Sequence, residues 1–467
     1  MAEPMRIQDT LRGQVVDLEP RDPGRVSIYA CGPTVYSRIH VGNARPFVTF
    51  ALLKRLLEHD GYDVTLVENI TDINDKIYVA AREAGVGSAQ LAEEMTAAYR
   101  ADTDRLELGR PDAEPLATET IPEIIDLISA LVDRGHAYES EGDVYFAVRT
   151  YDEYGKLSNR RLEDLQPADQ GEPDEETPRK RDPLDFALWK AQKPGEDTAW
   201  DSPWGPGRPG WHIECSAMAE KILGLEFDVH GGGIDLVFPH HENEIAQTEA
   251  GRGRGLARVW MHNGMVRFGE EKMAKSVGNI RTLADALDEH GRDALIMYFL
   301  SGHYRQPLGY GPDALEQAER SLERIRNFAR LVARSDPGAT AGEPEGRTAD
   351  LRDRLFAALR DDMHTPRALS ALFDLVAEGN RRLEAGETFP GAAAALAEML
   401  GVLGLENLLG ADEPADPEAE RLAADREQAR RDRDFARADE LRDELAERGY
   451  EVRDTSDGPV LVRIAGQ

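Results

Sequence analysis

The sequence predicts an α/β protein that begins with a parallel sheet and ends in a helical region. Three observations support this class. A strand, a turn, a helix and a second strand follow one another between residues 26 and 68, an order typical of a parallel sheet. The alternation breaks between Glu114 and Trp204, which indicates an inserted subdomain. From Asp313 onward the pattern is almost wholly helical, which indicates a bundle.

The first strand is expected at Val26–Ala30, an apolar and partly β-branched run that stops at Cys31-Gly32-Pro33. Apolar residues then fall at helical spacing from Ala44 to Glu58, and Asp63–Glu68 is again strand-like. In an open parallel sheet, ligands bind at the carboxyl ends of the strands. The turn that begins at Cys31 is therefore the first candidate position for a site.

The inserted subdomain should contain a helix near Ile121–Arg134 and a strand pair near Tyr138–Val148. A loop rich in proline and acidic residues follows from Gln166 to Asp182. The sheet is expected to resume around Trp211–Asp235.

Two loops rich in acidic residues with glycine or proline divide the helical part, at Ser335–Arg347 and Ala411–Pro417. The chain should end in a β-hairpin from Gly449 to Ile464, with its turn at Ser456-Asp457-Gly458.

The composition is strongly acidic. The 467 residues include 88 Asp and Glu against 56 Lys and Arg, a formal net charge of −32, and only nine of the cations are lysines. Such a charge usually disfavours nucleic acid, because phosphate contacts need Lys and Arg. Excess acid with scarce lysine is also typical of proteins from salt-accumulating cells, where the Debye length falls to about 3 Å in molar salt and repulsion is screened. An ordinary acidic protein at low salt is the alternative.

The chain carries no sequence signal for export or for a membrane. Its two cysteines, Cys31 and Cys215, do not make a disulfide framework, and the first twenty residues lack the apolar core of a signal peptide. No run of about 18 apolar residues occurs. We therefore expect a soluble cytoplasmic protein.

The tetrad His40-Val41-Gly42-Asn43 stands after the first turn and opens a helix. A helix N-terminus favours anions, and a glycine there lets a phosphate approach the backbone. The imidazole of His40 can donate to phosphate oxygens as charge develops. Taken alone, such a histidine is more often a helix cap or a packed side chain.

The run Lys272-Met273-Ala274-Lys275-Ser276 carries two lysines in a chain that otherwise avoids them. Lysines next to small residues suit a loop that closes over phosphates. The alternative is a solvated basic loop.

Together the two signatures resemble class I aminoacyl-tRNA synthetases, and longer strings resemble the cysteine-specific family. These strings are Cys31-Gly32-Pro33-Thr34-Val35-Tyr36, Asn69-Ile70-Thr71-Asp72, Asp185-Phe186-Ala187-Leu188-Trp189-Lys190, Gly210-Trp211-His212-Ile213-Glu214-Cys215-Ser216, Gly231-Gly232-Gly233, Phe238-Pro239-His240-His241-Glu242-Asn243-Glu244, Asp362-Met363-His364-Thr365-Pro366 and Asp434-Phe435-Ala436-Arg437-Ala438-Asp439. The resemblance covers nearly the whole chain. It departs at Ala274, where serine is usual, and at Asn74, where aspartate is frequent.

The resemblance implies a Rossmann-like catalytic domain with an insertion, then a helical bundle and a small C-terminal α/β element. The implied regions are a catalytic first half at 1–113, an inserted connective subdomain at 114–204, a catalytic second half at 205–265, a lysine-loop and stem-contact region at 266–312, a helical bundle at 313–410 and an anticodon-binding region at 411–467. A monomer is expected.

The implied reaction joins L-cysteine to tRNA-Cys with ATP and Mg²⁺, through a cysteinyl-adenylate. His40, Asn43, Lys272 and Lys275 would stabilise the charge on the phosphates. The implied ATP-binding residues are His40, Gly42, Asn43, His230, Gly231, Gly232, Asp235, Lys272 and Lys275. Gly32, Thr71 and Trp211 would line the cysteine pocket, although Trp211 could equally be a core residue.

The resemblance also implies one Zn²⁺ per chain, held by Cys31, Cys215, His240 and Glu244. Thiolates with imidazole favour Zn²⁺, and residues 240 and 244 are four apart, so they share one helix face. His241 is a competing ligand, but packing or support of the ligands from behind is the favoured role for it. A substrate thiol can ionise and bind such a metal, whereas a hydroxyl ionises far less readily, so the ion would select cysteine over serine.

Two alternative functions are an enzyme that passes activated cysteine to a different acceptor and a protein that catalyses no reaction. Enzymes of mycothiol synthesis activate cysteine in a similar catalytic half and pass it to an aminosugar, but they lack an anticodon-binding end. A non-catalytic paralogue that only binds RNA would be expected to lose His40, the zinc ligands or Lys275, and all are present.

Overall fold

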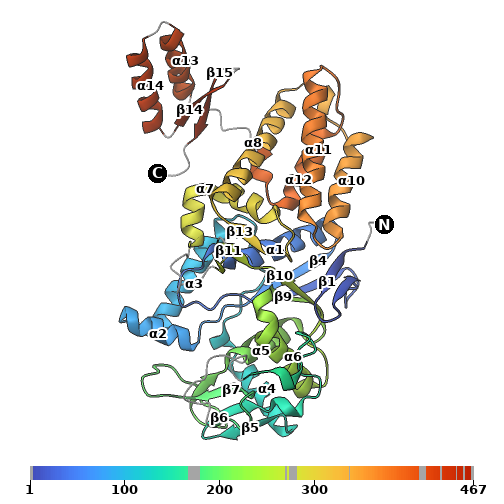
Figure 1. Ribbon diagram of the computed structural model, residues 1–467, viewed down its shortest axis with the longest axis vertical. Helices are drawn as coiled ribbons and strands as arrows, with labels where there is room; N and C mark the ends of the chain where they lie inside the picture. The colour runs from blue at the N-terminus through green and yellow to red at the C-terminus, as the bar shows by residue number, and fades with distance from the viewer. Residues whose placement is uncertain are drawn as a thin grey trace.

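Figure 1 shows the computed structural model of the chain, an elongated molecule with its main sheet near the middle. The structure describes residues 4–166, 179–268, 271–272, 281–335, 337–409, 417–431, 434–448, 450–455 and 458–463. Within these ranges, no helix is both long and apolar enough to cross a membrane.

The main sheet has four parallel strands in the order β10-β9-β3-β4. These are β3 (Arg25–Ala30), β4 (Asp63–Glu68), β9 (Phe227–Gly233) and β10 (Ala257–Asn263). Helix α1 (Val41–His59) connects β3 to β4, and α2 (Asp75–Ala84) and α3 (Ser88–Asp104) follow β4. The predicted strand–turn–helix–strand opening is confirmed.

The expectation that residues 211–235 are sheet was wrong for its first part. Trp211–Leu223 is helix α5, and only β9 continues the sheet. Its sequence holds Ala217, Met218 and Ala219, which favour helix, and Gly224 ends it with a φ of 73°. Helix α6 (Glu242–Arg252) then leads to β10.

The insertion forms its own antiparallel sheet, β5-β6-β7-β8. Its strands are β5 (Ala137–Ser140), β6 (Asp143–Phe146), β7 (Phe186–Ala191) and β8 (Gly207–Pro209), and α4 (Ile121–Asp133) precedes them. The predicted helix and strand pair are confirmed. Most of the predicted acidic loop, residues 167–178, lies outside the described residues.

The helical part contains α7 (Leu283–Leu300), α8 (Pro312–Arg334), the short α9 (Pro337–Thr340), α10 (Arg347–Arg360), α11 (Thr365–Glu384) and α12 (Ala392–Leu403). A small sheet of β11 (Val266–Phe268), β12 (Glu271–Lys272) and β13 (Leu308–Tyr310) joins it to the main sheet, and the hairpin of β1 (Arg6–Asp9) and β2 (Gln14–Asp17) flanks β10. One continuous apolar core runs from β3 and α1 through α7 into α10, α11 and α12.

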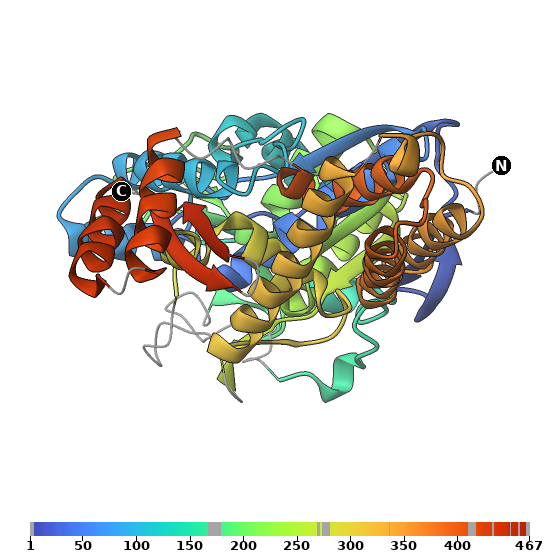
Figure 2. The ribbon, with the colours of Figure 1, turned by 90° about the horizontal axis from the view of Figure 1, so that it is seen from above.

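The C-terminal unit consists of α13 (Pro417–Arg431), α14 (Phe435–Glu447), β14 (Tyr450–Thr455) and β15 (Gly458–Arg463). The two strands pair antiparallel, so the predicted hairpin is confirmed. Its small core is separate from the main one and includes Ala419, Leu422, Leu441 and Leu445. Figures 1 and 2 place the unit at one end of the molecule, to the left in both views.

Candidate metal centre and active site

The candidate site forms where the strands of the main sheet end. Gly32 follows β3, and its backbone N–H donates to Asn69 Oδ1 at 3.0 Å just beyond β4. A Cβ added to Gly32 would lie 1.8 Å from the carbonyl oxygen of Asn69. Thr34 and Thr71 then pair as a parallel bridge. The ends of β3 and β4 are thus held together where only glycine fits.

His40 caps the start of α1, where the side-chain oxygen of Asn43 accepts from its backbone N–H at 3.2 Å. A Cβ at Gly42 would stand 2.8 Å from His40 Cε1, so this glycine makes room for the imidazole. The backbone N–H of Val41 donates to Arg281 O, and that of Leu283 donates to Ile39 O. The segment just after the lysine run therefore lies against the histidine signature.

Lys275 lies outside the described residues, and the structure describes only the backbone of Lys272, in β12. The expected roles of both lysines at the phosphates therefore stay predictions.

A buried cluster of metal-ligand atoms adjoins the end of β3. It consists of Cys31, His240, His241 and Glu244, whose ligand atoms all lie within 4.8 Å of one another. Cys31 Sγ is 3.6 Å from both His240 Nε2 and Glu244 Oε1, and His240 Nε2 is 3.1 Å from Glu244 Oε1. The spacing of residues 240 and 244 thus brings them together, as expected.

The fourth expected ligand, Cys215, lies beside this cluster and is not among those four. It comes from α5, and its thiol is hydrogen-bonded to that of Cys31. His241 instead falls within the cluster, with Nε2 3.3 Å from Cys31 Sγ. The residues brought together therefore offer two thiols, two imidazoles and one carboxylate, a donor set suited to a tetrahedral zinc site.

Comparisons with known proteins agree along nearly the whole chain. Residues 17–320 match the model of the class I (C) tRNA synthetase catalytic domain, 355–408 match the DALR domain, and 412–460 match the cysteinyl-tRNA ligase anticodon binding domain. A cysteine–tRNA ligase of Alkalilimnicola ehrlichii is 50% identical over 97% of this chain and 98% of its own length. That of Halorhodospira halophila is 48% identical over the same shares.

The chain belongs to the cysteinyl-tRNA synthetase family. Among solved structures, a Mycobacterium tuberculosis methionyl-tRNA synthetase is 17% identical, with a TM-score of 0.62, and the match covers 85% of this chain and 92% of that one. This likeness shows the class I synthetase fold.

Three of the candidate ligands, His240, His241 and Glu244, are each oriented by a further buried histidine. His230 Nε2 is 2.8 Å from Glu244 Oε2, and His212 Nδ1 is 2.9 Å from His240 Nδ1. His262 Nε2 is 2.7 Å from His241 Nδ1. Such outer hydrogen bonds fix the orientation of metal-binding side chains.

His230 is placed differently from the role expected for it. Its imidazole is fully buried, bonds to Glu244 and stacks on Trp260 with ring centroids 4.4 Å apart. It therefore lies behind the candidate ligands rather than on the surface of a nucleotide site. A Cβ at the neighbouring Gly231 would meet the ring of Phe50, which explains that glycine by packing alone.

Burial dominates the electrostatics of the cluster. It raises the pKa of the Cys31 thiol and lowers the pKa of the His240 and His241 imidazoles. The hydrogen bond with Cys31 lowers the pKa of the Cys215 thiol, but burial together with the nearby Glu244 and Glu214 raises it overall. Without a cation, both thiols and both imidazoles are therefore held neutral. A divalent cation reverses this balance because it stabilises thiolates, so the donor set and its burial fit a metal ion.

Trp211 covers the cluster from the solvent side. Its side chain is 36% exposed, and its indole stacks on His240 with ring centroids 4.3 Å apart and an interplanar angle of 24°. The alternative that it is a core residue was wrong. Gly32 follows the ligand Cys31 directly, and Thr71 is buried at the end of β4, where its hydroxyl accepts from Asn69.

Sequence reasoning missed the roles of His212 and His262. A signal was present, because five of the eleven histidines of the chain gather here: His212, His230, His240, His241 and His262. They come from α5, β9, the turn before α6 and β10, so only the fold brings them together.

Proposed function

We infer that this protein activates L-cysteine with ATP and transfers the cysteinyl group to the 3′ end of tRNA-Cys. The observation that carries this inference is the buried cluster of Cys31, His240 and Glu244 beneath Trp211, because Cys31 opens the same β3–α1 segment that ends at the helix start at His40. One segment of the chain thus connects a site suited to a thiol with a helix start suited to phosphate. The family to which the chain belongs supports the same reaction.

In the first step, the cysteine carboxylate attacks the α-phosphorus of ATP and pyrophosphate leaves. His40 and Asn43 at the start of α1, with Lys272 and Lys275, stabilise the charge that develops on the phosphates, which Mg²⁺ accompanies. Gly42, Gly232 and Asp235 lie along the expected path of the nucleotide. In the second step, a hydroxyl of the terminal adenosine takes the cysteinyl group.

We propose Zn²⁺ as the ion, one per chain, held by Cys31, Cys215, His240 and Glu244, with His241 as the competing ligand. When bound, it supplies a Lewis acid that takes the substrate thiolate and leaves a serine hydroxyl unbound. Gly32 and Thr71 shape the pocket around the amino acid, and Trp211 limits access of water from outside.

We propose that the bundle contacts the tRNA stem and that the C-terminal unit reads the anticodon loop, whose splayed bases suit stacking and edge contacts. Two arginines on the described helices of this unit contribute little free charge. Arg431 and Arg437 pair with Glu427 and Glu440 on their own helices, as expected for a solvated helix. We place the protein in the cytoplasm as a monomer.

The test is cysteine-dependent exchange of pyrophosphate into ATP, followed by acceptor assays with tRNA-Cys and with an aminosugar. We expect exchange with cysteine and not with serine, and charging of tRNA only. Exchange without tRNA charging, together with transfer to the aminosugar, would favour a role in mycothiol synthesis instead.

A further inference from the structure

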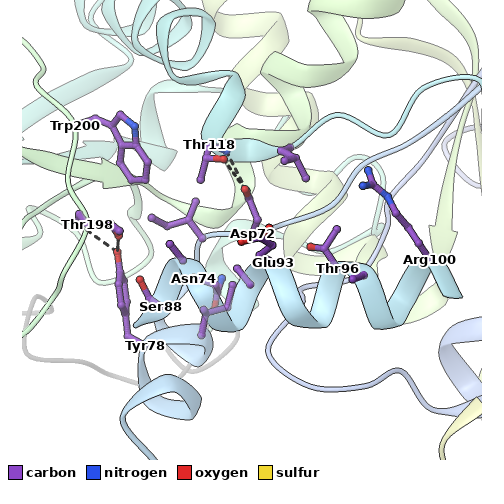
Figure 3. A pocket seen from close by; sticks show the side chains of 16 residues that line it. Asp72, Asn74, Tyr78, Ser88, Glu93, Thr96, Arg100, Thr118, Thr198 and Trp200 are labelled. Atoms are coloured by element: carbon purple, nitrogen blue, oxygen red, sulfur yellow. Dashed lines mark hydrogen bonds between the residues drawn. The ribbon is translucent and has the colours of Figure 1, made fainter. Parts of the chain in front are cut away.

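A cavity of about 590 Å³ lies outside the site described above, between α2, α3 and the last part of the insertion. In Figure 3, Trp200 and Tyr78 lie on one side of it, and Thr96 and Arg100 lie on the other. Its volume is in the range of small-molecule and nucleotide sites.

The walls of this cavity are tied together by side-chain hydrogen bonds. The hydroxyl of Tyr78 on α2 is 2.6 Å from Thr198 Oγ1, and the backbone N–H of Ser88 at the start of α3 donates to Asp197 Oδ2 at 2.8 Å. The backbone of Trp200 pairs with Gly207, where β8 begins. The cavity is thus a built feature that joins the catalytic half to the insertion.

The cavity opens beside the reacting centre but on the other side from the expected adenosine site. Asp72 and Asn74 line it and follow Thr71 directly at the end of β4. Of the residues proposed for the nucleotide, Gly232 stands on β9 and Asp235 follows that strand, and β3 lies between β9 and β4 in the sheet. With ATP placed as proposed above, this cavity is left for another ligand.

The lining combines a flat aromatic surface with polar groups at the edges. The half-buried ring of Trp200 offers a stacking face. Glu93 presents a carboxylate that can accept from an exocyclic amine, and Arg100 presents a guanidinium that can donate to a ring carbonyl, although it also pairs with Glu114 at 3.2 Å. Unstacked bases of single-stranded RNA are recognised by this combination of stacking and edge contacts.

Three lysines lie around the start of α2, the helix that forms one wall of the cavity. Lys76 is exposed at the start of α2, and its Nζ is 5.6 Å from the centroid of the Tyr36 ring, on the loop that leads to His40. Lys190 Nζ is 3.2 Å from Asp75 Oδ2, and Lys193 also acts on this carboxylate. Lys76 is thus an exposed cation between the loop that leads to His40 and the wall of the cavity, where it can meet a phosphate backbone.

We propose that this cavity binds an unstacked, amino-bearing base of the single-stranded 3′ end of the tRNA, one of the two nucleotides before the terminal adenosine. The base stacks on Trp200 and its amine faces Glu93, while Lys76 faces the phosphates. Holding this base positions the terminal hydroxyl at the carboxyl end of β4. The proposal rests on the proposed function, since it names a contact of the same substrate.

The test introduces a large side chain at the rim of the cavity, where it would occupy the space proposed for the base. Ala97 on α3 is exposed and lines the cavity, whereas Ala101, one turn further along, is exposed and does not. We expect Ala97→Trp to raise KM for tRNA roughly tenfold or more, as for the loss of one stacked base, while pyrophosphate exchange changes by less than about twofold. Ala101→Trp should leave both assays unchanged.

A second arm uses tRNA transcripts that lack the base at either of the two positions. Base removal at one of them should raise KM for the wild type as much as Ala97→Trp does, and the variant should charge intact and base-less tRNA equally. Normal KM in Ala97→Trp, or equal losses from base removal in both proteins, would overturn the proposal. Absence of cysteine-dependent exchange in the wild type would instead overturn the proposed function.

Discussion

Replacing Gly32 by alanine tests whether the junction of β3 and β4 sets the geometry of the cysteine pocket. The added Cβ would lie 1.8 Å from the carbonyl oxygen of Asn69 and 3.2 Å from Glu68 Cγ. The first contact is with backbone, so no side-chain rotation relieves it. The two strand ends must open by about 1.6 Å to restore an ordinary contact of 3.4 Å.

This displacement falls between Cys31 and Thr71, which bracket the pocket. A misplacement of about 1 Å at a reacting centre costs roughly 100-fold in rate, and overpacking costs about 1–3 kcal/mol in stability. We therefore expect kcat/KM for cysteine in pyrophosphate exchange to fall about 100-fold or more in Gly32→Ala. The protein should remain folded, because the rest of the core is untouched.

The matched control is Gly401→Ala in α12, where an added Cβ meets nothing within 4 Å. This variant should keep full activity and gain up to about 1 kcal/mol in stability from better helix propensity. Exchange kinetics and melting temperature are measured for both variants. Wild-type kcat/KM in Gly32→Ala would refute the idea that the close approach of Gly32 and Asn69 shapes the pocket.

Four further outcomes are expected. Cys215→Ser should lose bound zinc and cysteine activation together, measured by elemental analysis and exchange; full activity in metal-free protein would exclude a metal role. Lys275→Ala should slow adenylate formation by orders of magnitude in single-turnover assays with little change in cysteine binding, and an unchanged rate would remove its role. Burial raises the pKa of Glu68 to about 8, so the folded state keeps a proton that the unfolded state releases near pH 4.5. The free energy of unfolding should therefore fall by roughly 1.4 kcal/mol per pH unit as the pH rises between those values. Glu68→Gln should flatten this slope in denaturant titrations. Melting temperature and charging rate should both rise from dilute buffer toward molar KCl because of the charge of −32, and a steady decline of both would contradict the halophilic interpretation.

The sequence predicts the elements of this fold wherever one period dominates. Apolar runs predict β3 and β4, and apolar residues at helical spacing predict α1 and the bundle. Trp211–Leu223 is a helix where sheet was expected, and its residues 212–219 are all buried, so no single apolar face marks the helical period. Local pattern could not separate it from the strand that follows, since tertiary burial on nearly all sides hides the helical period.

Only part of the candidate site could be predicted from the sequence. The spacing of His240 and Glu244 predicts that they meet, and the structure agrees. Cys31 and Cys215 belong to distant segments, so no spacing could pair them, and only the family resemblance did. His212 and His262 contact the ligands from other elements, which no local pattern encodes. The cavity beside Trp200 likewise depends on how the insertion packs against α2 and α3.

The division of apolar cores has a consequence for how the molecule responds to heat. The main core passes without a break from the parallel sheet into the helical bundle, so these parts should melt in one cooperative transition. The C-terminal unit has a small core of its own and should lose structure independently, at lower temperature. Calorimetry of the whole chain should then show a minor early transition that leaves the metal cluster and cysteine activation intact.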